Sequence, residues 1–137
     1  MRVEHIAYMV QRPPEVAAWY CRHLGFSVRR KMDGSPWTHF ILDAAGSTML
    51  EIYNNPACSV PDYWSWDPLL FHIAFVCADV PGTVRRLVAA GCAIQSPTLT
   101  TEAGDTLAML RDPWGLAIQL CRRGSPMVGE GAGREGG

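Results

Sequence analysis

The feature that most constrains this chain is an internal repeat with an offset of 67 residues. The segment 4–8 (EHIAY) aligns with the segment 71–75 (FHIAF), and a histidine holds the second position of each copy. A repeat of this length indicates an architecture that uses one supersecondary unit more than once. We therefore expect two equivalent modules, each beginning with a strand.

Each copy continues with the same order of predicted elements. The first helix opens near Pro13 and ends at Gly25, and the second opens near Pro81 and ends at Gly91. Proline in the first turn and glycine after the last turn are typical helix boundaries. Short apolar segments bounded by Gly, Pro and Asp follow each helix and indicate strands. They are 26–32, 37–43 and 48–53 in the first copy, and 92–100, 106–111 and 116–121 in the second.

The order β-α-β-β-β, used twice, predicts an α+β fold. We expect two tandem βαβββ modules that form a cup-shaped eight-stranded mixed sheet with the helices on its outer face. The predicted domain covers residues 1–122 and contains module one (1–54), a linker (55–69) and module two (70–122). A flexible, Gly-rich tail is expected over residues 123–137.

Composition excludes several classes of protein. With 137 residues and 48% hydrophobic content, the chain can bury a core without disulfides. A net charge of −1 gives no reason to expect nucleic acid or a membrane as a partner. The N-terminal segment is interpreted as a strand rather than a signal peptide. Five cysteines without C-x-x-C spacing argue against a disulfide framework or a Cys-type zinc site, so we expect a cytoplasmic protein.

Side-chain alternation indicates where a functional site would lie. Successive side chains in a strand point to opposite faces. In four strands at equivalent positions of the repeat, one face is apolar and suits packing under a helix. The other face carries one side chain that can bind a metal. These four residues are His5, Glu51, His72 and Gln119, which converge if a pseudo-twofold axis relates the modules.

Two imidazoles and a carboxylate suit a divalent Ni, Co, Zn, Mn or Fe ion, with a carboxamide oxygen as a weaker fourth ligand. We therefore expect one divalent metal ion as cofactor. Open coordination positions would accept an oxygen substrate and polarise it. A carboxylate beside the metal, here Glu51, could then remove a proton next to a carbonyl.

The structural alternative is that these residues only pack or pair. A single histidine in a strand is more often structural than a ligand. Here His5 and His72 occupy the same repeat position, and Glu51 and Gln119 also match, at an offset of 68. A buried Glu51 without a metal would need a cationic partner, and the strand positions offer none. The correlation favours the metal site.

Other residues are candidates for substrate contacts. Met9 shares a strand face with His5, and His39 lies in an aromatic segment that could line the cup. Tyr53 and Asn55 follow Glu51 and are candidates for substrate binding or for a turn. The tryptophans of the linker could cover the pocket, form a dimer contact or simply pack.

Two motifs resemble the vicinal oxygen chelate superfamily. Residues 19–26 (WYCRHLGF) resemble its F-Y-x-x-x-L-G-F helix exit, and residues 112–120 (DPWGLAIQL) resemble its D-P-x-G-x-x-I-E-L hairpin. The resemblance covers residues 1–122. This superfamily includes glyoxalase I, methylmalonyl-CoA epimerase, extradiol dioxygenases, fosfomycin-resistance enzymes and bleomycin-binding proteins.

The resemblance implies that the four residues named above occupy metal-ligand positions. Relative to the epimerase, Glu and Gln are exchanged between the modules, so the implied catalytic base is Glu51 rather than residue 119. Met9 stands where glyoxalase I commonly has an arginine, which argues against glutathione, although Asn55 is kept. Members of the superfamily commonly dimerise, so we expect a homodimer whose site forms within one chain or across two.

The expected function is that of a divalent-metal-dependent lyase or isomerase of the glyoxalase (lactoylglutathione lyase-like) or epimerase type. Its substrate would be a small α-oxygenated carbonyl compound. One alternative is an Fe(II)-dependent extradiol-type dioxygenase, since His5, His72 and Glu51 also form a two-His-one-carboxylate set. The other alternative is a metal-free protein that binds a small molecule such as an antibiotic.

Overall fold

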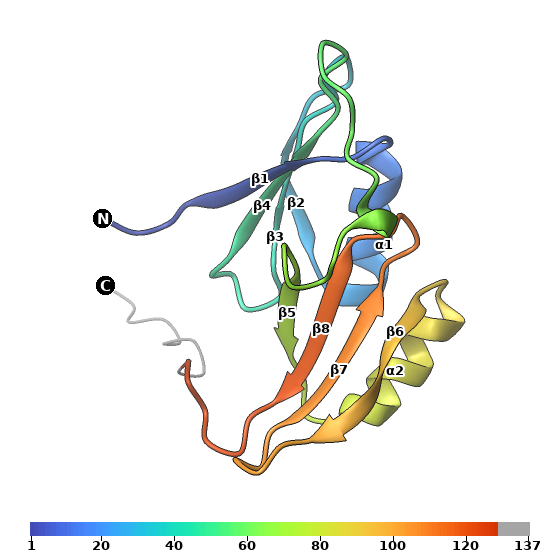
Figure 1. Ribbon diagram of the computed structural model, residues 1–137. Helices are drawn as coiled ribbons and strands as arrows, with labels where there is room; N and C mark the ends of the chain where they lie inside the picture. The colour runs from blue at the N-terminus through green and yellow to red at the C-terminus, as the bar shows by residue number, and fades with distance from the viewer. Residues whose placement is uncertain (129–137) are drawn as a thin grey trace, which may run out of the picture. The chain divides into compact units, whose positions relative to one another are not determined.

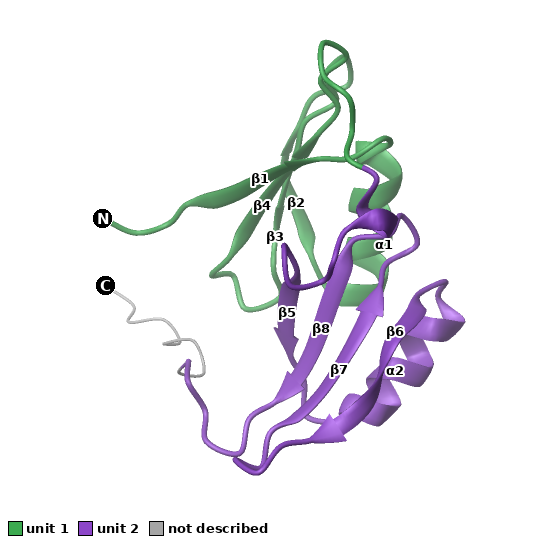
Figure 2. Ribbon diagram, in the orientation of Figure 1, with its two compact units in different colours: residues 1–61 green, residues 62–137 purple. Residues whose placement is uncertain are grey.

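The computed structural model describes residues 1–128 and contains the predicted repeat of βαβββ modules (Figure 1). The chain divides into unit 1, Met1–Pro61, and unit 2, Asp62–Gly137 (Figure 2). The α+β fold with two tandem modules is confirmed. The part of the predicted flexible tail from residue 129 onward lies outside the described residues.

Unit 1 is a mixed four-stranded sheet with one helix. Its sheet has the order β1-β4-β3-β2, with β1 parallel to β4 and the other neighbours antiparallel. A helical crossover is what allows two strands of one module to pair in parallel. The elements are β1 (His5–Met9), α1 (Pro13–Leu24), β2 (Ser27–Lys31), β3 (His39–Leu42) and β4 (Met49–Tyr53).

Unit 2 repeats this topology with the order β5-β8-β7-β6, and β5 is parallel to β8. Hydrogen bonds join four strands in each unit, so the eight predicted strands form two sheets of four. A short 3-10 turn, η1 (Tyr63–Ser65), precedes the module. Its other elements are β5 (Ile73–Val76), α2 (Val80–Ala89), β6 (Ala93–Thr100), β7 (Thr106–Arg111) and β8 (Ala117–Arg122).

The helix boundaries follow the predicted proline and glycine signals. Helix α1 ends at Gly25, which has a φ of 75° and whose N–H donates to the carbonyl of Tyr20. Helix α2 begins after Asp79, whose side chain accepts a hydrogen bond from the N–H of Gly82. In residues 1–128, no helix is long and apolar enough to cross a membrane.

One face of each sheet packs against the helix of its own unit. In unit 1, Ile41, Leu50 and Ile52 are at most 2% exposed and lie on the same side as Tyr20 of α1. In unit 2, Leu110, Ile118, Leu120 and the α2 residue Leu87 are equally buried. Burying each such side chain stabilises the fold by about 1.5–3 kcal/mol. Strand alternation then leaves the other face of each sheet for polar side chains.

Part of the predicted linker is a structured portion of unit 2. The boundary between the units lies after Pro61, and η1 follows directly. Tyr63 is only 6% exposed, and its ring meets that of Trp66 edge to face at 5.2 Å. The tryptophan-rich segment therefore packs on its own module.

Candidate functional site

The register of unit 1 brings two predicted ligands together. Ala7 of β1 lies opposite Glu51 of β4, and His5 precedes Ala7 by two positions, so His5 and Glu51 share one sheet face. The His5 Nε2 atom is 3.2 Å from the Glu51 Oε2 atom. Phe40 lies opposite Glu51 on the third strand of this face, and its ring meets the His5 imidazole edge to face at 5.5 Å.

The distance within this pair is compatible with two ligands of one metal ion. Two atoms that lie about 2.1 Å from the same ion are about 3.0 Å apart at a right angle and about 3.4 Å apart at a tetrahedral angle. The observed 3.2 Å falls between these values. The other imidazole nitrogen of His5, Nδ1, is 3.3 Å from Glu4 Oε1. A carboxylate at this position commonly orients a histidine that binds a metal.

The same distance also suits a direct hydrogen bond from a protonated Nε2 to the carboxylate. Metal binding and this hydrogen bond would use the same two atoms. The side chains of His5 and Glu51 are 34% and 23% exposed, so both remain reachable from solvent. The pair is therefore open to a ligand that can replace the hydrogen bond.

Unit 2 repeats this register. Ala74 of β5 lies opposite Gln119 of β8, and His72 precedes Ala74 by two positions. His72 and Gln119 are both half-buried. The carbonyl of Pro68 lies 2.8 Å from His72 Nδ1. Since a carbonyl can only accept, Nδ1 carries a proton in this contact, which is the tautomer that offers its Nε2 lone pair to a ligand when the ring is neutral.

No group of three or more His, Cys, Asp or Glu side chains that could hold a metal occurs in residues 1–128. The structure supplies the His5–Glu51 pair in unit 1 and the equivalent His72 and Gln119 positions in unit 2. The complete four-residue metal site stays a prediction.

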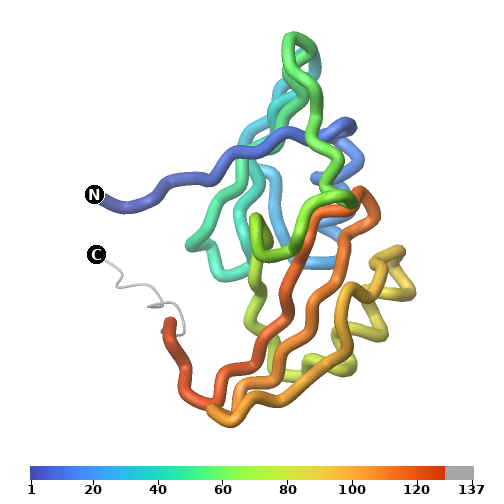
Figure 3. Tube along the Cα trace, viewed as in Figure 1, coloured from blue at the N-terminus to red at the C-terminus, as the bar shows by residue number. Residues whose placement is uncertain are grey.

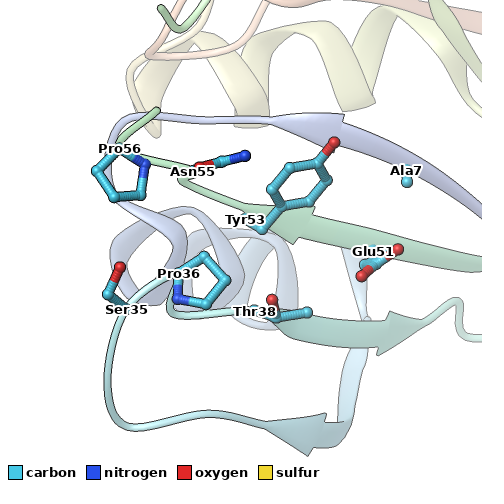
Figure 4. A pocket seen from close by; sticks show the side chains of 8 residues that line it. All are labelled: Ala7, Ser35, Pro36, Thr38, Glu51, Tyr53, Asn55 and Pro56. Atoms are coloured by element: carbon cyan, nitrogen blue, oxygen red, sulfur yellow. The ribbon is translucent and has the colours of Figure 1, made fainter. Parts of the chain in front are cut away.

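A pocket of about 570 Å³ lies beside Glu51 in unit 1 (Figure 4). This volume is within the usual range of about 300–1,000 Å³ for small-molecule sites. Two predicted substrate contacts, Tyr53 and Asn55, line it, and Figure 4 shows Tyr53 and Glu51 projecting from the same strand. The lining residues are Ala7, Ser35, Pro36, Thr38, Glu51, Tyr53, Asn55 and Pro56.

The lining combines polar and apolar groups and carries little charge. Glu51 is the one ionisable carboxylate among the eight lining residues, and none of the eight is Lys, Arg or His. The remaining polar groups are hydroxyls and one carboxamide, which bind neutral oxygen and nitrogen atoms. Such a pocket suits an uncharged ligand better than an anionic one.

Two loops contribute residues to the lining of the pocket and are joined by a hydrogen bond. Figure 3 shows the loop before β3 running beside the segment that follows β4. The N–H of Asn54 donates to the carbonyl of Pro36 at 2.8 Å, and its side chain donates to the carbonyl of Gln11 at 2.9 Å. Trp37, which follows Pro36, has a φ of 53°, which is unusual outside glycine. Such backbone conformations are concentrated at functional sites.

Two predicted substrate contacts do not join this pocket. His39 lies opposite Ile52 and therefore faces the helix side of the sheet, where it is only 6% exposed. Its Nδ1 atom is 2.7 Å from the carbonyl of Trp37, so it supports the loop instead. Met9 lies opposite Tyr53 but is not among the lining residues.

Sequence reasoning missed other residues near Glu51. Phe40 and Thr38 lie on the Glu51 face of the sheet, which follows from the register between β3 and β4 and not from the sequence alone. Ser35 and Pro36 come from an irregular loop for which the sequence offers no periodic signal.

Residues 2–120 match the model of the Glyoxalase/Bleomycin resistance protein/Dioxygenase superfamily. No match was found among the curated proteins. Among solved structures, the protein SMU.1112c is similar, with 27% identity and a TM-score of 0.70 over 89% of this chain and 98% of that chain.

Two further structures have the same fold. A glyoxalase family protein from Bacillus cereus is 13% identical, with a TM-score of 0.76 over 90% of this chain and 94% of that chain. TnmS3, an antibiotic binding protein from Streptomyces sp. CB03234, is 19% identical, with a TM-score of 0.66 over 90% and 96%. At these identities, both likenesses concern the fold alone.

Proposed function

Because this chain belongs to the glyoxalase/bleomycin resistance protein/dioxygenase superfamily, we propose that it is a divalent-metal-dependent lyase or isomerase. Its substrate is a small, uncharged α-oxygenated carbonyl compound. The proposed ligands are His5, Glu51, His72 and Gln119. The observation that carries the proposal is the 3.2 Å separation of His5 Nε2 and Glu51 Oε2 beside the pocket of unit 1.

The donor set suits the proposed cofactor. Imidazole and carboxylate groups bind Ni, Co, Zn, Mn and Fe, and the pair in unit 1 fits two adjacent coordination positions. Gln119 adds a neutral and weaker oxygen donor. When bound, such an ion supplies the Lewis acidity that polarises a substrate carbonyl.

The residues of the pocket bind and orient the substrate in this proposal. The hydroxyls of Tyr53 and Thr38 and the amide of Asn55 donate hydrogen bonds to substrate oxygens, and the Tyr53 ring and Pro36 supply apolar contacts. The lining side chains include no Lys, Arg or His, so the phosphate groups of esters and the carboxylates of glutathione adducts gain no charge pairing with the protein there. The side chains therefore favour a neutral substrate.

Glu51 is the proposed catalytic base. Its Oε2 atom faces His5, which leaves Oε1 to accept a proton from the carbon atom next to the substrate carbonyl. Returning that proton from Glu51 to a neighbouring atom on the same face of the substrate completes an isomerisation.

The test is the metal content of protein purified without added metal or an affinity tag. We expect about one equivalent of a transition metal in the native chain, lost in His5→Ala and His72→Ala. His23→Ala is the matched control, because His23 lies on α1 against Trp19 and is not a proposed ligand. Native protein that takes up none of the five metals on titration would overturn the proposal.

Activity of Glu51→Gln tests the base separately. Loss of activity with metal retained supports Glu51 as the base, and full activity excludes that role. Oxygen uptake with catechols by the Fe(II)-loaded protein would instead indicate the dioxygenase alternative.

A metal-free binding protein is the second candidate. The observation in its favour is that the pocket is lined by residues of unit 1 alone and needs no ion to define it. TnmS3, an antibiotic binding protein, has the same fold. Neutral ligands that bind equally well with and without a chelator would favour this candidate.

A further inference from the structure

Residues 62–68, here called the strap, form a stiff segment at the start of unit 2. The side chain of Asp62 accepts a hydrogen bond from the N–H of Trp64 at 3.2 Å, and its carbonyl accepts from the Ser65 hydroxyl at 2.7 Å. The N–H of Trp66 donates to the carbonyl of Tyr63 at 3.2 Å. Together with the buried Tyr63 ring, these bonds fix the backbone of η1.

The side chain of Arg111, at the end of β7, anchors the strap through hydrogen bonds. Arg111 is only 5% exposed, and its guanidinium donates to the carbonyls of Tyr63 and Trp66, both at 2.7 Å. It also donates to the carbonyl of Gly115 at 3.1 Å and to Gln95 Oε1 at 2.8 Å. All four of these acceptors are neutral oxygens. A buried cation tolerates such surroundings only while its hydrogen bonds are kept, and lysine cannot reproduce this planar fork.

The strap ends at the carbonyl that contacts His72. A turn follows in which the side chain and carbonyl of Asp67 accept from the N–H groups of Leu69 at 2.8 Å and Leu70 at 2.9 Å. The carbonyl of Pro68, at the end of the strap, accepts from His72 Nδ1 at 2.8 Å. The position of this carbonyl therefore depends on the strap that Arg111 holds.

We propose that Arg111 is a positioning residue for His72: by holding the strap, it fixes the Pro68 carbonyl that keeps His72 in the Nδ1–H tautomer, with the Nε2 lone pair free. The inference rests on the proposed function in one respect, which is that the Nε2 lone pair of His72 binds a metal. The tautomer can be measured without metal, so the two ideas can fail separately.

The experiment records the ¹⁵N tautomer states of the histidines in the metal-free native chain at about pH 8.5, above the ordinary histidine range. Arg111→Lys is compared with Arg123→Lys, a control in the same unit whose arginine contacts Asp105 and not the strap. His39 is an internal reference, because its Nδ1 contacts the Trp37 carbonyl in unit 1.

We expect His72 to be Nδ1–H in the native chain and in Arg123→Lys, and a mixture of tautomers in Arg111→Lys with His39 unchanged. Co(II) affinity should fall about 10–100-fold in Arg111→Lys, as is typical when a group that orients a ligand is lost. A native His72 that is Nε2–H overturns the proposal, as does an Arg111→Lys variant identical to the native chain in both measurements.

Circular dichroism tests whether Arg111→Lys still folds. If it does not, Gln95→Ala removes only one of the four bonds of Arg111 and should give a smaller tautomer shift in the same direction. The absence of that shift would also count against the proposal. A native chain that binds none of the five proposed metals refutes the metal-dependent function, while the tautomer result still decides the role of Arg111.

Discussion

At the scale of single residues, burial decides which thiols can react. Cys92 is 6% exposed, and burial, with a smaller contribution from the charge of Asp112, raises the pKa of its thiol to about 12. Cys58 is exposed in the loop after β4. Because the thiolate is the reactive form, a thiol reagent at about pH 8 should modify Cys58 quickly and leave Cys92 intact.

The measurement is mass spectrometry of the labelled native protein over time. Cys58→Ser should remove the fast phase, and Cys92→Ser should leave it unchanged. Labelling of Cys92 at the rate of Cys58 in the folded chain would contradict the burial argument.

Asp105 couples folding to pH. Hydrogen bonds from the Gly124 N–H and from Arg123 hold the pKa of its carboxyl below the ordinary value. The unfolded chain therefore binds this proton more readily than the folded chain. The resulting stability is fully present above the ordinary pKa and is lost as the pH falls through the lowered folded value.

Urea unfolding of Asp105→Asn against the native chain tests this. The native chain should be more stable from pH 7 down to about pH 5, and the difference should shrink below about pH 4, near the ordinary aspartate value. Arg123→Gln removes one of the two hydrogen-bond donors to Asp105. It should reproduce part of the pH-dependent loss of stability. A difference independent of pH would exclude the charge as its cause.

The sequence predicted that His5 and Glu51 lie on the same face of the sheet. Strand alternation and the repeat can both be recognised from the spacing of residues along the chain, so no knowledge of the strand register was needed. They could not assign His39, since its face depends on the register between β3 and β4. The loop residues of the pocket were equally beyond reach, because Trp37 adopts a backbone conformation that side-chain type does not signal.

At the scale of elements, the two hairpin turns share an aspartate acceptor and a glycine three residues after it. Asp43 Oδ1 accepts from the N–H groups of Ser47 and Thr48, and Asp112 Oδ1 accepts from those of Trp114 and Leu116. Each turn also has a glycine with positive φ, 71° at Gly46 and 96° at Gly115. The signals that predicted these turns are therefore their physical cause.

The two turns differ in the space around their glycines, so the same Gly→Ala substitution can be compared at both. A Cβ at Gly115 would lie 2.6 Å from the Trp64 ring, whereas a Cβ at Gly46 meets nothing within 4 Å. Gly46→Ala should cost about 1–2 kcal/mol for its positive φ. Gly115→Ala should cost about 1–3 kcal/mol more, because the tryptophan must move.

Chemical denaturation of both variants measures the difference. Trp64→Ala in the Gly115→Ala background should recover part of the additional loss. Equal destabilisation at the two glycines would mean that Trp64 does not pack on this turn as described.

The packing of the strap on unit 2 could not be predicted from the sequence. Arg111 is the last residue of an otherwise largely apolar strand, a position at which a charged side chain is usually exposed to solvent. Its burial depends on backbone carbonyls of Tyr63 and Trp66, which any residue types would supply. Hydrogen bonds to backbone carbonyls do not depend on which side chains the segment carries. The composition of residues 55–69 therefore predicted a linker.

At the scale of the whole molecule, the repeat predicted the tandem modules because each copy carries a full set of helix and turn signals. Each sheet nevertheless has two edge strands, β1 and β2 in unit 1, and β5 and β6 in unit 2. Exposed edges favour pairing with another chain unless they are protected. Large apolar side chains near β5 are also exposed: Leu69 at 82%, Leu70 at 73% and Val76 at 66%.

Apolar exposure of this kind marks interaction surfaces, and we expect a homodimer of about twice 15.1 kDa in sedimentation experiments. Val76→Lys places a charge on the β5 surface and should shift the equilibrium toward monomer. Val88→Lys on α2 is the matched control, because Val88 is also exposed, at 40%, but lies on the helix. If dimerisation uses the β5 surface, only Val76→Lys weakens it. A native chain that sediments as a monomer at high concentration rules out the dimer, and equal weakening by both variants would place the interface elsewhere.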